Sequence, residues 1–254
     1  LGIKGDAVEP LSAMSYQDNP SCHLKRARNF SEKKSNQHYK SISLNNKKRP
    51  RIGYFSSDFF NHATMYLMIR IFELHNKKEF DIYIYDYGKN KEDEMTERLK
   101  QSNPIYRKLE NLTNLEIVSL AREDNLDIAI DLKGHTFESN IKIFASRVAP
   151  IQISYLGYPG STGLDNIDYI IADKIIIPEK YTKFYSEQII NMPNCYQCND
   201  DSKVISKESS TRKDNNLPDI GIVFTCFNAN YKITPREFDI WMRIIKNTKE
   251  SVLW

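Results

Sequence analysis

Three side chains that could support group-transfer chemistry lie in loops that follow predicted buried strands. His62 comes shortly after the apolar run 51–55, His135 after the run 126–132, and Lys232 after the run 220–226. A histidine in such a loop can accept a proton from an attacking hydroxyl group or donate a hydrogen bond to a sugar. Each histidine also has a structural alternative, because a histidine can cap the next helix or bond to a backbone carbonyl, and Gly134 favours a turn beside His135.

Lys232 lies just before Thr234 and Pro235, which are typical of the N-cap and the first position of a helix. The N-terminus of a helix attracts anions, and a lysine beside it adds positive charge, so this sequence favours a phosphate-binding pocket. An ordinary surface lysine is the alternative at this position.

Common cofactor and metal motifs are missing from the sequence. Gly157, Gly160 and Gly163 do not match the G-x-G-x-x-G pattern of dinucleotide-binding loops, and no P-loop sequence is present. No D-x-D pair is present to hold a divalent cation on a diphosphate. We therefore expect no metal and no cofactor, and a site that binds phosphate through lysine and backbone N–H groups.

The four cysteines predict neither a disulfide framework nor a zinc site. Cys195 and Cys198 form a lone C-x-x-C pair, and no histidine or second pair lies nearby to complete tetrahedral coordination. We expect the cysteines to be reduced.

Composition indicates a soluble protein that binds neither nucleic acid nor a membrane. Hydrophobic residues make up 40% of the 254 residues and aromatic residues 11%, which is enough for a buried core. The net charge of +3 comes from scattered basic runs, whereas nucleic-acid-binding proteins usually cluster theirs. No apolar run reaches the roughly 20 residues of a spanning helix, and the start does not resemble a signal peptide, so we expect a cytoplasmic protein. Because the chain begins with Leu1 and ends at Trp254 within a predicted strand, we expect it to be a fragment.

The elements that must position these loops alternate between strands and helices. Predicted strands cover residues 51–55, 80–87, 105–109, 126–132, 150–156 and 169–172, and predicted helices cover residues 65–75, 91–102, 114–124 and 138–146. This alternation predicts an α/β fold with a mainly parallel, Rossmann-like sheet that is covered on both faces. Ligands of such sheets bind beyond the carboxyl ends of the strands, where His62 and His135 lie.

Composition also divides the chain into four segments. Residues 1–48 are polar and predict a connecting segment, residues 49–198 hold the predicted lobe, and residues 199–217 form a polar linker. Residues 218–254 predict a strand, a helix over 235–247 and the start of another strand. That pattern is typical of the opening of a second, truncated Rossmann-like lobe.

The connecting segment contains one predicted helix. It begins at Asn19-Pro20 and carries an apolar stripe of Leu24, Ala27 and Phe30, with a basic side that we expect to face solvent (Lys25, Arg26 and Arg28). Residues 35–48 predict a disordered stretch.

The loops described above lie in segments that resemble the catalytic region of the O-GlcNAc transferase/SPINDLY family. The matching segments are 51–62 (RIGYFSSDFFNH), 131–136 (DLKGHT), 149–163 (APIQISYLGYPGSTG), 168–173 (DYIIAD), 227–235 (FNANYKITP) and 251–254 (SVLW). The similarity extends from about Glu9 to the end of the chain, and the segments are highly specific in combination. The chain most resembles a bacterial-type member whose catalytic region is linked to repeats.

This resemblance implies a GT-B glycosyltransferase, in which two Rossmann-like lobes hold the donor in a cleft between them, usually with tetratricopeptide repeats upstream. It implies inverting, metal-independent transfer of GlcNAc from UDP-GlcNAc to serine or threonine hydroxyl groups of proteins. SPINDLY-type relatives use GDP-fucose, so GDP-fucose or another sugar nucleotide is the alternative donor. A non-catalytic scaffold that keeps the fold is a second alternative.

The resemblance also implies residue roles by motif match. His62 corresponds to the active-site histidine, acting as a base or as a contact of the donor sugar. Lys232 corresponds to the residue that binds the diphosphate and stabilises the departing UDP. The other expected donor-binding residues are Thr136, at the sugar and phosphate, and Tyr231, Asn228, Lys133 and His135.

Two positions depart from the animal members of this family. Ala229 stands where they have a glutamine that touches the nucleotide, and Lys133 stands where they have an asparagine.

The family's later uridine- and ribose-binding loops would follow Trp254. We therefore predict that residues 1–254 alone have little or no transferase activity.

Overall fold

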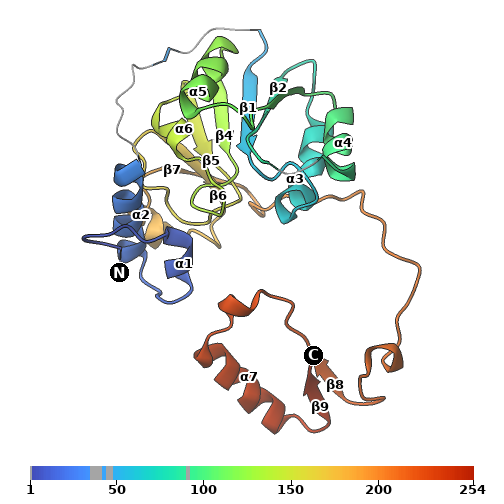
Figure 1. Cartoon of the computed structure of the whole chain (residues 1–254). Helices are drawn as coiled ribbons and strands as arrows, with labels where there is room; N and C mark the ends of the chain where they lie inside the picture. The colour runs from blue at the N-terminus through green and yellow to red at the C-terminus, as the bar shows by residue number, and fades with distance from the viewer. Residues whose placement is uncertain (1, 35–41, 44–47, 90–91) are drawn as a thin grey trace. The chain divides into compact units, whose positions relative to one another are not determined.

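The computed structural model describes residues 2–34, 42–43, 48–89 and 92–254. These residues fall into two compact units (Figure 1). The N-terminal unit comprises residues 1–14 and 19–202, and the C-terminal unit comprises residues 15–18 and 203–254. The predicted disordered stretch over 35–48 lies almost wholly outside the described residues.

The N-terminal unit is built on a seven-stranded sheet in the order β3-β2-β1-β4-β5-β6-β7. Its strands are β1 (Arg51–Ser56), β2 (Asp81–Asp86), β3 (Ile105–Lys108), β4 (Ile128–Asp131), β5 (Ile151–Ser154), β6 (Tyr169–Ala172) and β7 (Gln188–Asn191). Every neighbouring pair is parallel, which confirms the predicted parallel sheet. The strand order reverses between β1 and β4. The chain leaves these two neighbouring strands in opposite directions, and a crevice that can bind ligands opens between their loops.

Helices cover both faces of this sheet, as predicted. They are α3 (Ala63–Leu74), α4 (Glu94–Gln101), α5 (Asn114–Glu123) and α6 (Lys142–Ala145). Successive residues of a strand point to opposite faces, so Tyr54 packs in the core with α3 and α4, whereas Phe55 packs in the core with α5 and α6. Figure 1 shows the two helix pairs on opposite sides of the strands.

The N-terminal helices belong to the same unit as the sheet. They are α1 (Pro10–Met14) and α2 (Pro20–Lys34), and α2 lies against the short 3₁₀ helix η1 (Glu179–Phe184). Ala27 of the predicted apolar stripe is fully buried. The expectation that the whole basic side of this helix faces solvent is wrong for Arg26, which is 3% exposed and lies 3.0 Å from the ring of His23.

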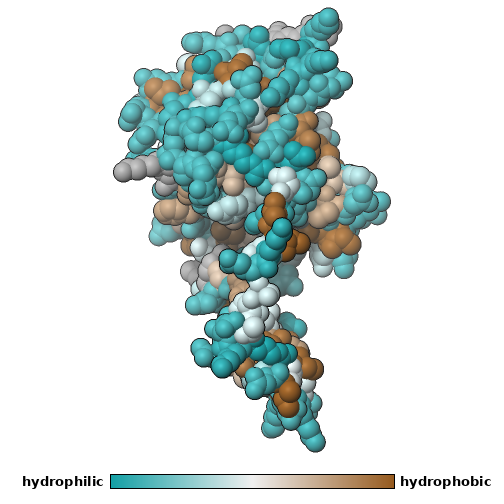
Figure 2. Space-filling model, turned by 90° about the vertical axis from the view of Figure 1, so that its right-hand side faces the viewer, coloured by the Kyte–Doolittle hydropathy of each residue, from teal (hydrophilic) through white to brown (hydrophobic). Residues whose placement is uncertain are grey.

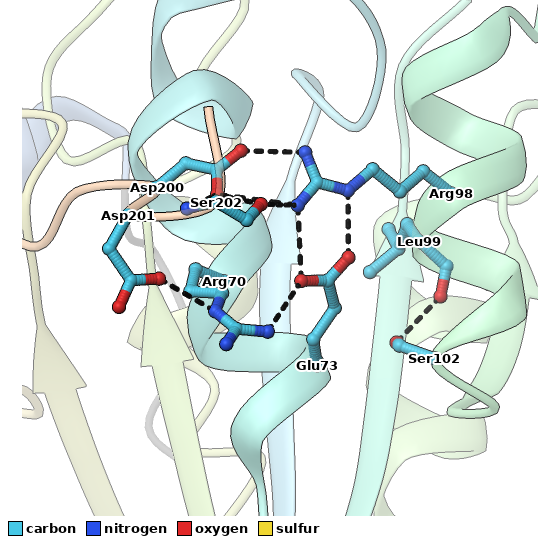
Figure 3. Close-up of polar contacts among 8 residues, drawn as sticks. All are labelled: Arg70, Glu73, Arg98, Leu99, Ser102, Asp200, Asp201 and Ser202. Atoms are coloured by element: carbon cyan, nitrogen blue, oxygen red, sulfur yellow. Dashed lines mark hydrogen bonds and ion pairs between the residues drawn. The ribbon is translucent and has the colours of Figure 1, made fainter. Parts of the chain in front are cut away.

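The last residues of the N-terminal unit are held by an ion-pair cluster (Figure 3). Arg98 of α4 contacts Glu73 of α3 at 2.7 Å and Asp200 at 2.6 Å. Arg70 of α3 contacts Asp201 at 2.7 Å and also pairs with Glu73. Arg98 therefore fastens the end of this unit to two helices, a few residues beyond the predicted boundary at 198.

The C-terminal unit contains one βαβ unit, as predicted. Its elements are η2 (Lys213–Asn215), β8 (Ile222–Phe224), η3 (Asn230–Lys232), α7 (Pro235–Asn247) and β9 (Ser251–Leu253), with β8 and β9 parallel. No residue of α7 is buried, and Phe227 is 79% exposed. Hydrophilic residues dominate the face in Figure 2, and hydrophobic residues lie among them in both units.

Candidate active site

Four of the predicted site residues come together at the carboxyl edge of the N-terminal sheet. His62 lies in the loop after β1, and Lys133, His135 and Thr136 lie in the loop after β4. Because β1 and β4 are neighbouring parallel strands, their loops leave the same edge of the sheet. Asp58 and Asp131 lie in the same two segments, and the sequence analysis had not singled them out.

His62 is the N-cap of α3. Its Nδ1 accepts a hydrogen bond from the Thr64 backbone N–H at 3.2 Å, and it lies 3.5 Å from Oδ2 of Asp58. The capping alternative for His62 is thus confirmed, yet the side chain is still 41% exposed. In the neutral imidazole an accepting Nδ1 leaves the ring proton on Nε2, so the ring can cap the helix and still donate a hydrogen bond from its other nitrogen.

Lys133 forms a buried ion pair with Asp58. Its Nζ lies 2.7 Å from Oδ2 of Asp58, and the two side chains are only 5% and 7% exposed. Ser57 donates a hydrogen bond to the other carboxylate oxygen of Asp58 at 3.1 Å. The ammonium group of Lys133 is therefore engaged inside the protein, and the pair ties the loop after β1 to the loop after β4.

Asp131 shapes the turn that carries the second loop. Its carboxylate oxygens accept hydrogen bonds from the backbone N–H groups of Lys133 at 3.0 Å and Gly134 at 2.9 Å. Burial raises the pKa of Asp131 to about 6, although these hydrogen bonds and the charge of Lys133 act in the opposite direction. Gly134 was the sequence signal for this turn, and Asp131, three residues before it at the end of an apolar strand, could have added to that signal.

His135 and Thr136 complete the loop after β4. His135 is 1% exposed, and its Nε2 lies 2.7 Å from the carbonyl oxygen of Thr162 in the loop after β5. Thr136 is partly exposed, and its hydroxyl donates to the carbonyl of Lys133 at 2.9 Å. The geometry thus gives His135 the role of a buried loop contact, which was its structural alternative, and leaves Thr136 nearer the surface.

The C-terminal unit carries the remaining predicted site residues. Asn228 and Lys232 are exposed, and Lys232 lies in η3 before Thr234, the N-cap of α7. The side chain of Tyr231 lies outside the described part of the structure. A cavity of about 430 Å³ lies beside α7, with Cys226, Phe227 and Asn228 among its lining residues.

The described residues contain no clustered metal ligands and no disulfide bond. Within residues 2–34, 42–43, 48–89 and 92–254, no group of three or more histidine, cysteine, aspartate or glutamate residues is arranged to hold a metal ion. All four cysteines are free. None of the helices in the described chain is long and apolar enough to cross a bilayer.

A doubly wound parallel sheet with polar loops at its carboxyl edge, followed by a further βαβ unit, matches the GT-B fold. The chain belongs to glycosyl transferase family 41, whose family model matches residues 17–209 and 205–254. Together with the relatives below, this result confirms the resemblance to the O-GlcNAc transferase/SPINDLY family and places the chain in a family of glycosyltransferases.

Individual relatives agree with this assignment. The chain is 35% identical over 212 residues to "Probable UDP-N-acetylglucosamine–peptide N-acetylglucosaminyltransferase SEC" of Arabidopsis thaliana, covering 82% of this chain and 22% of that protein. It is 30% identical over 208 residues to the SPINDLY protein of the same plant, covering 80% of this chain and 22% of that protein. A UDP-N-acetylglucosamine–peptide N-acetylglucosaminyltransferase of Caenorhabditis elegans is 30% identical, covering 71% of this chain and 16% of that protein. The chain thus spans about a fifth of the length of these curated relatives.

A solved structure shows the same fold. A point mutant of the Thermobaculum terrenum O-GlcNAc transferase superposes with a TM-score of 0.83 at 24% sequence identity, covering 95% of this chain and 47% of that chain.

Proposed function

We propose that the protein containing this chain transfers GlcNAc from UDP-GlcNAc to serine or threonine hydroxyl groups of proteins, with inversion at the sugar and without a metal ion. Family membership and the names of the relatives support the donor and the acceptor class. The absence of a D-x-D motif supports a metal-free reaction. We also propose that it works in the cytoplasm and carries tetratricopeptide repeats upstream.

The observation that carries the proposal is the placement of His62. The ring is fixed at the carboxyl edge of the sheet by the hydrogen bond from Thr64 to Nδ1, and it is 41% exposed. Parallel α/β sheets bind ligands at this edge. A neutral ring held in this way carries its proton on Nε2, so we assign His62 the donation of a hydrogen bond to the donor sugar rather than the role of general base.

Lys232 would supply the charge that a metal supplies in other transferases. Bond cleavage leaves negative charge on the departing UDP, and an ammonium group near the N-terminus of a helix stabilises such charge. Lys232 lies on η3 beside the start of α7, which suits this role. Thr136, Tyr231 and Asn228 remain proposed contacts of the donor.

Lys133 and His135 take different roles in this proposal from the donor contacts first expected. The ammonium group of Lys133 neutralises buried Asp58, and His135 binds a backbone carbonyl. The replacement of asparagine by Lys133 therefore adds no cation to the donor site and is no argument for another donor. Ala229 replaces a glutamine that touches the nucleotide in the animal members, and this departure favours another donor, so GDP-fucose remains the alternative.

The test uses the full-length protein, with His62→Asn as the main variant. Asparagine is a good N-cap, so α3 should keep its stability, but its short side chain cannot reach the position of Nε2. We expect the thermal midpoint to stay within about 2 °C of the wild type, as for a substitution that keeps its cap, and the transfer rate from UDP-GlcNAc to fall at least about a hundredfold, as for the loss of a hydrogen bond made in the transition state.

Three outcomes would contradict the proposal. Full activity in His62→Asn would remove His62 from the reaction. Transfer from GDP-fucose but not from UDP-GlcNAc would establish the alternative donor. Binding of neither donor in a thermal-shift measurement, with no turnover, would indicate a scaffold.

A further inference from the structure

One backbone carbonyl joins the loop after β4, the loop after β5 and helix α2. The carbonyl oxygen of Thr162 lies 2.7 Å from Nε2 of His135 and accepts a hydrogen bond from the hydroxyl of Ser31 at 2.8 Å. Thr162 is fully buried, and His135 and Ser31 are each 1% exposed. Because the acceptor is a carbonyl, Nε2 of His135 must carry a proton. The hydrogen bond from His135 to Thr162 therefore fixes both the position and the tautomer of the His135 ring.

A buried carboxylate holds Thr162 from the other side. Glu187, directly before β7, is 4% exposed. It accepts hydrogen bonds from the backbone N–H of Thr162 at 2.7 Å, from the hydroxyl of Ser161 at 2.7 Å, and from the hydroxyl of Thr162. Such charge-assisted bonds are stronger than neutral ones, and a buried partner left without its bond is costly. Glu187 therefore determines where the carbonyl of Thr162 points.

Helix α2 closes the cluster. The rings of Phe30 and Tyr158 both meet the ring of His135 edge-on, each with a centroid separation of 5.2 Å. Gly163 has a φ of +70°, and a Cβ atom there would lie 2.5 Å from the backbone nitrogen of Arg28. Helix and loop thus pack in backbone contact, so a shift of α2 must move the loop that holds His135.

We propose that Glu187 and Ser31 are positioning residues for the loop of Thr136, acting through Thr162 and His135. The loop is short: Thr136 directly follows His135, and its backbone N–H donates to the carbonyl of Lys133 at 3.3 Å. A displaced His135 ring must therefore displace Thr136. The effect on donor binding rests on the proposed function, whereas the coupling between the loops does not.

The coupling is tested by hydrogen–deuterium exchange of the full-length protein. The variants are Glu187→Gln, with exposed Glu179→Gln as its control, and Ser31→Ala, with Ser21→Ala on the same helix as its control. Losing the links should speed exchange in peptides covering 133–136 by about tenfold or more, because the amides there depend on the fixed turn. Exchange in β1 and β2 and in both controls should not change.

Two exchange results would overturn the proposal. Faster exchange confined to 157–164 would show that the loops are not coupled. Faster exchange throughout the sheet would show that Glu187 only stabilises the fold.

Kinetics provide an independent measure with the same four variants. A variant that is merely less stable contains fewer active molecules, which lowers the apparent kcat but leaves KM for the donor unchanged. A displaced Thr136 should instead raise the donor KM by about tenfold, since misplaced contacts weaken binding. An unchanged donor KM together with unchanged exchange at 133–136 would refute the proposal. If the wild type transfers no sugar, the proposed function fails, and the exchange result still decides the coupling.

Discussion

Removing Lys133 should strongly destabilise the N-terminal unit, because it would leave the carboxylate of Asp58 buried without its partner. The two side chains are 5% and 7% exposed and 2.7 Å apart. Breaking a buried ion pair from one side costs about 3–5 kcal/mol. For a unit of this size each kcal/mol corresponds to roughly 2–4 °C in thermal midpoint. We therefore expect Lys133→Met to lower the midpoint by about 6–20 °C.

The assay is thermal unfolding followed by circular dichroism, with three comparisons. Lys100→Met removes the partly exposed pair with Glu92 and should cost less than about 1 kcal/mol. The double variant Asp58→Asn/Lys133→Met removes both charges and should recover at least half of the loss, because no unpaired charge remains. If Lys133→Met lowers the thermal midpoint no more than Lys100→Met does, the Asp58–Lys133 pair is not buried as described.

Three further predictions follow from the same structure. Burial raises the pKa of Asp131 from 3.8 to about 6. The contribution of this carboxyl group to stability is therefore full below pH 3.8 and falls as the pH rises through 6. Relative to Asp131→Asn, the wild type should lose ~3 kcal/mol of unfolding free energy between pH 3.5 and 7. Arg98→Gln should speed proteolysis of residues 199–202 by about tenfold, measured by mass spectrometry, because charged hydrogen bonds to Asp200 and Ser202 worth about 1.5–3 kcal/mol are lost. Gly163→Ala should lower the free energy of unfolding by about 1–3 kcal/mol or more, because the φ of Gly163 is positive and the backbone of α2 is in contact. Gly5 also has a positive φ but has open space around it, so Gly5→Ala should lower this free energy less. Denaturant unfolding measures both.

Each of these three has a clear contrary result. Parallel pH profiles of the wild type and Asp131→Asn would show that the buried carboxyl titrates normally. Unchanged cleavage in Arg98→Gln would show that the ion-pair cluster does not hold the end of the unit. Equal losses in the two alanine variants would show that backbone strain, and not the contact with α2, sets the cost.

Most of the N-terminal fold could be predicted from local sequence patterns. Six strands were identified because apolar, β-branched and aromatic residues concentrate in them. Strand β7 was missed because its two isoleucines are flanked by polar residues at an edge of the sheet, which leaves a weak pattern. The predicted helix over 138–146 shortens to α6 because Glu138 has a φ of 57° and ends up in a turn.

The site was predictable in position but not in its internal pairing. The rule that ligands bind at the carboxyl edge located His62 and the loop after β4. It could not reveal that Lys133 pairs with Asp58, 75 positions away, because that contact depends on the adjacency of β1 and β4. The same holds for Ser31 and Thr162, which are 131 positions apart. Ser31 carried no signal in the sequence beyond its place on a helix.

The most direct test of the account is the transfer of GlcNAc from UDP-GlcNAc to a protein acceptor by the full-length protein in the presence of EDTA. Intact-mass spectrometry would follow the wild type, Lys232→Ala and the exposed control Lys249→Ala. We predict that the wild type and Lys249→Ala add GlcNAc at equal rates without a metal, and that Lys232→Ala adds none. Transfer that requires a divalent metal, or that persists in Lys232→Ala, would contradict the account.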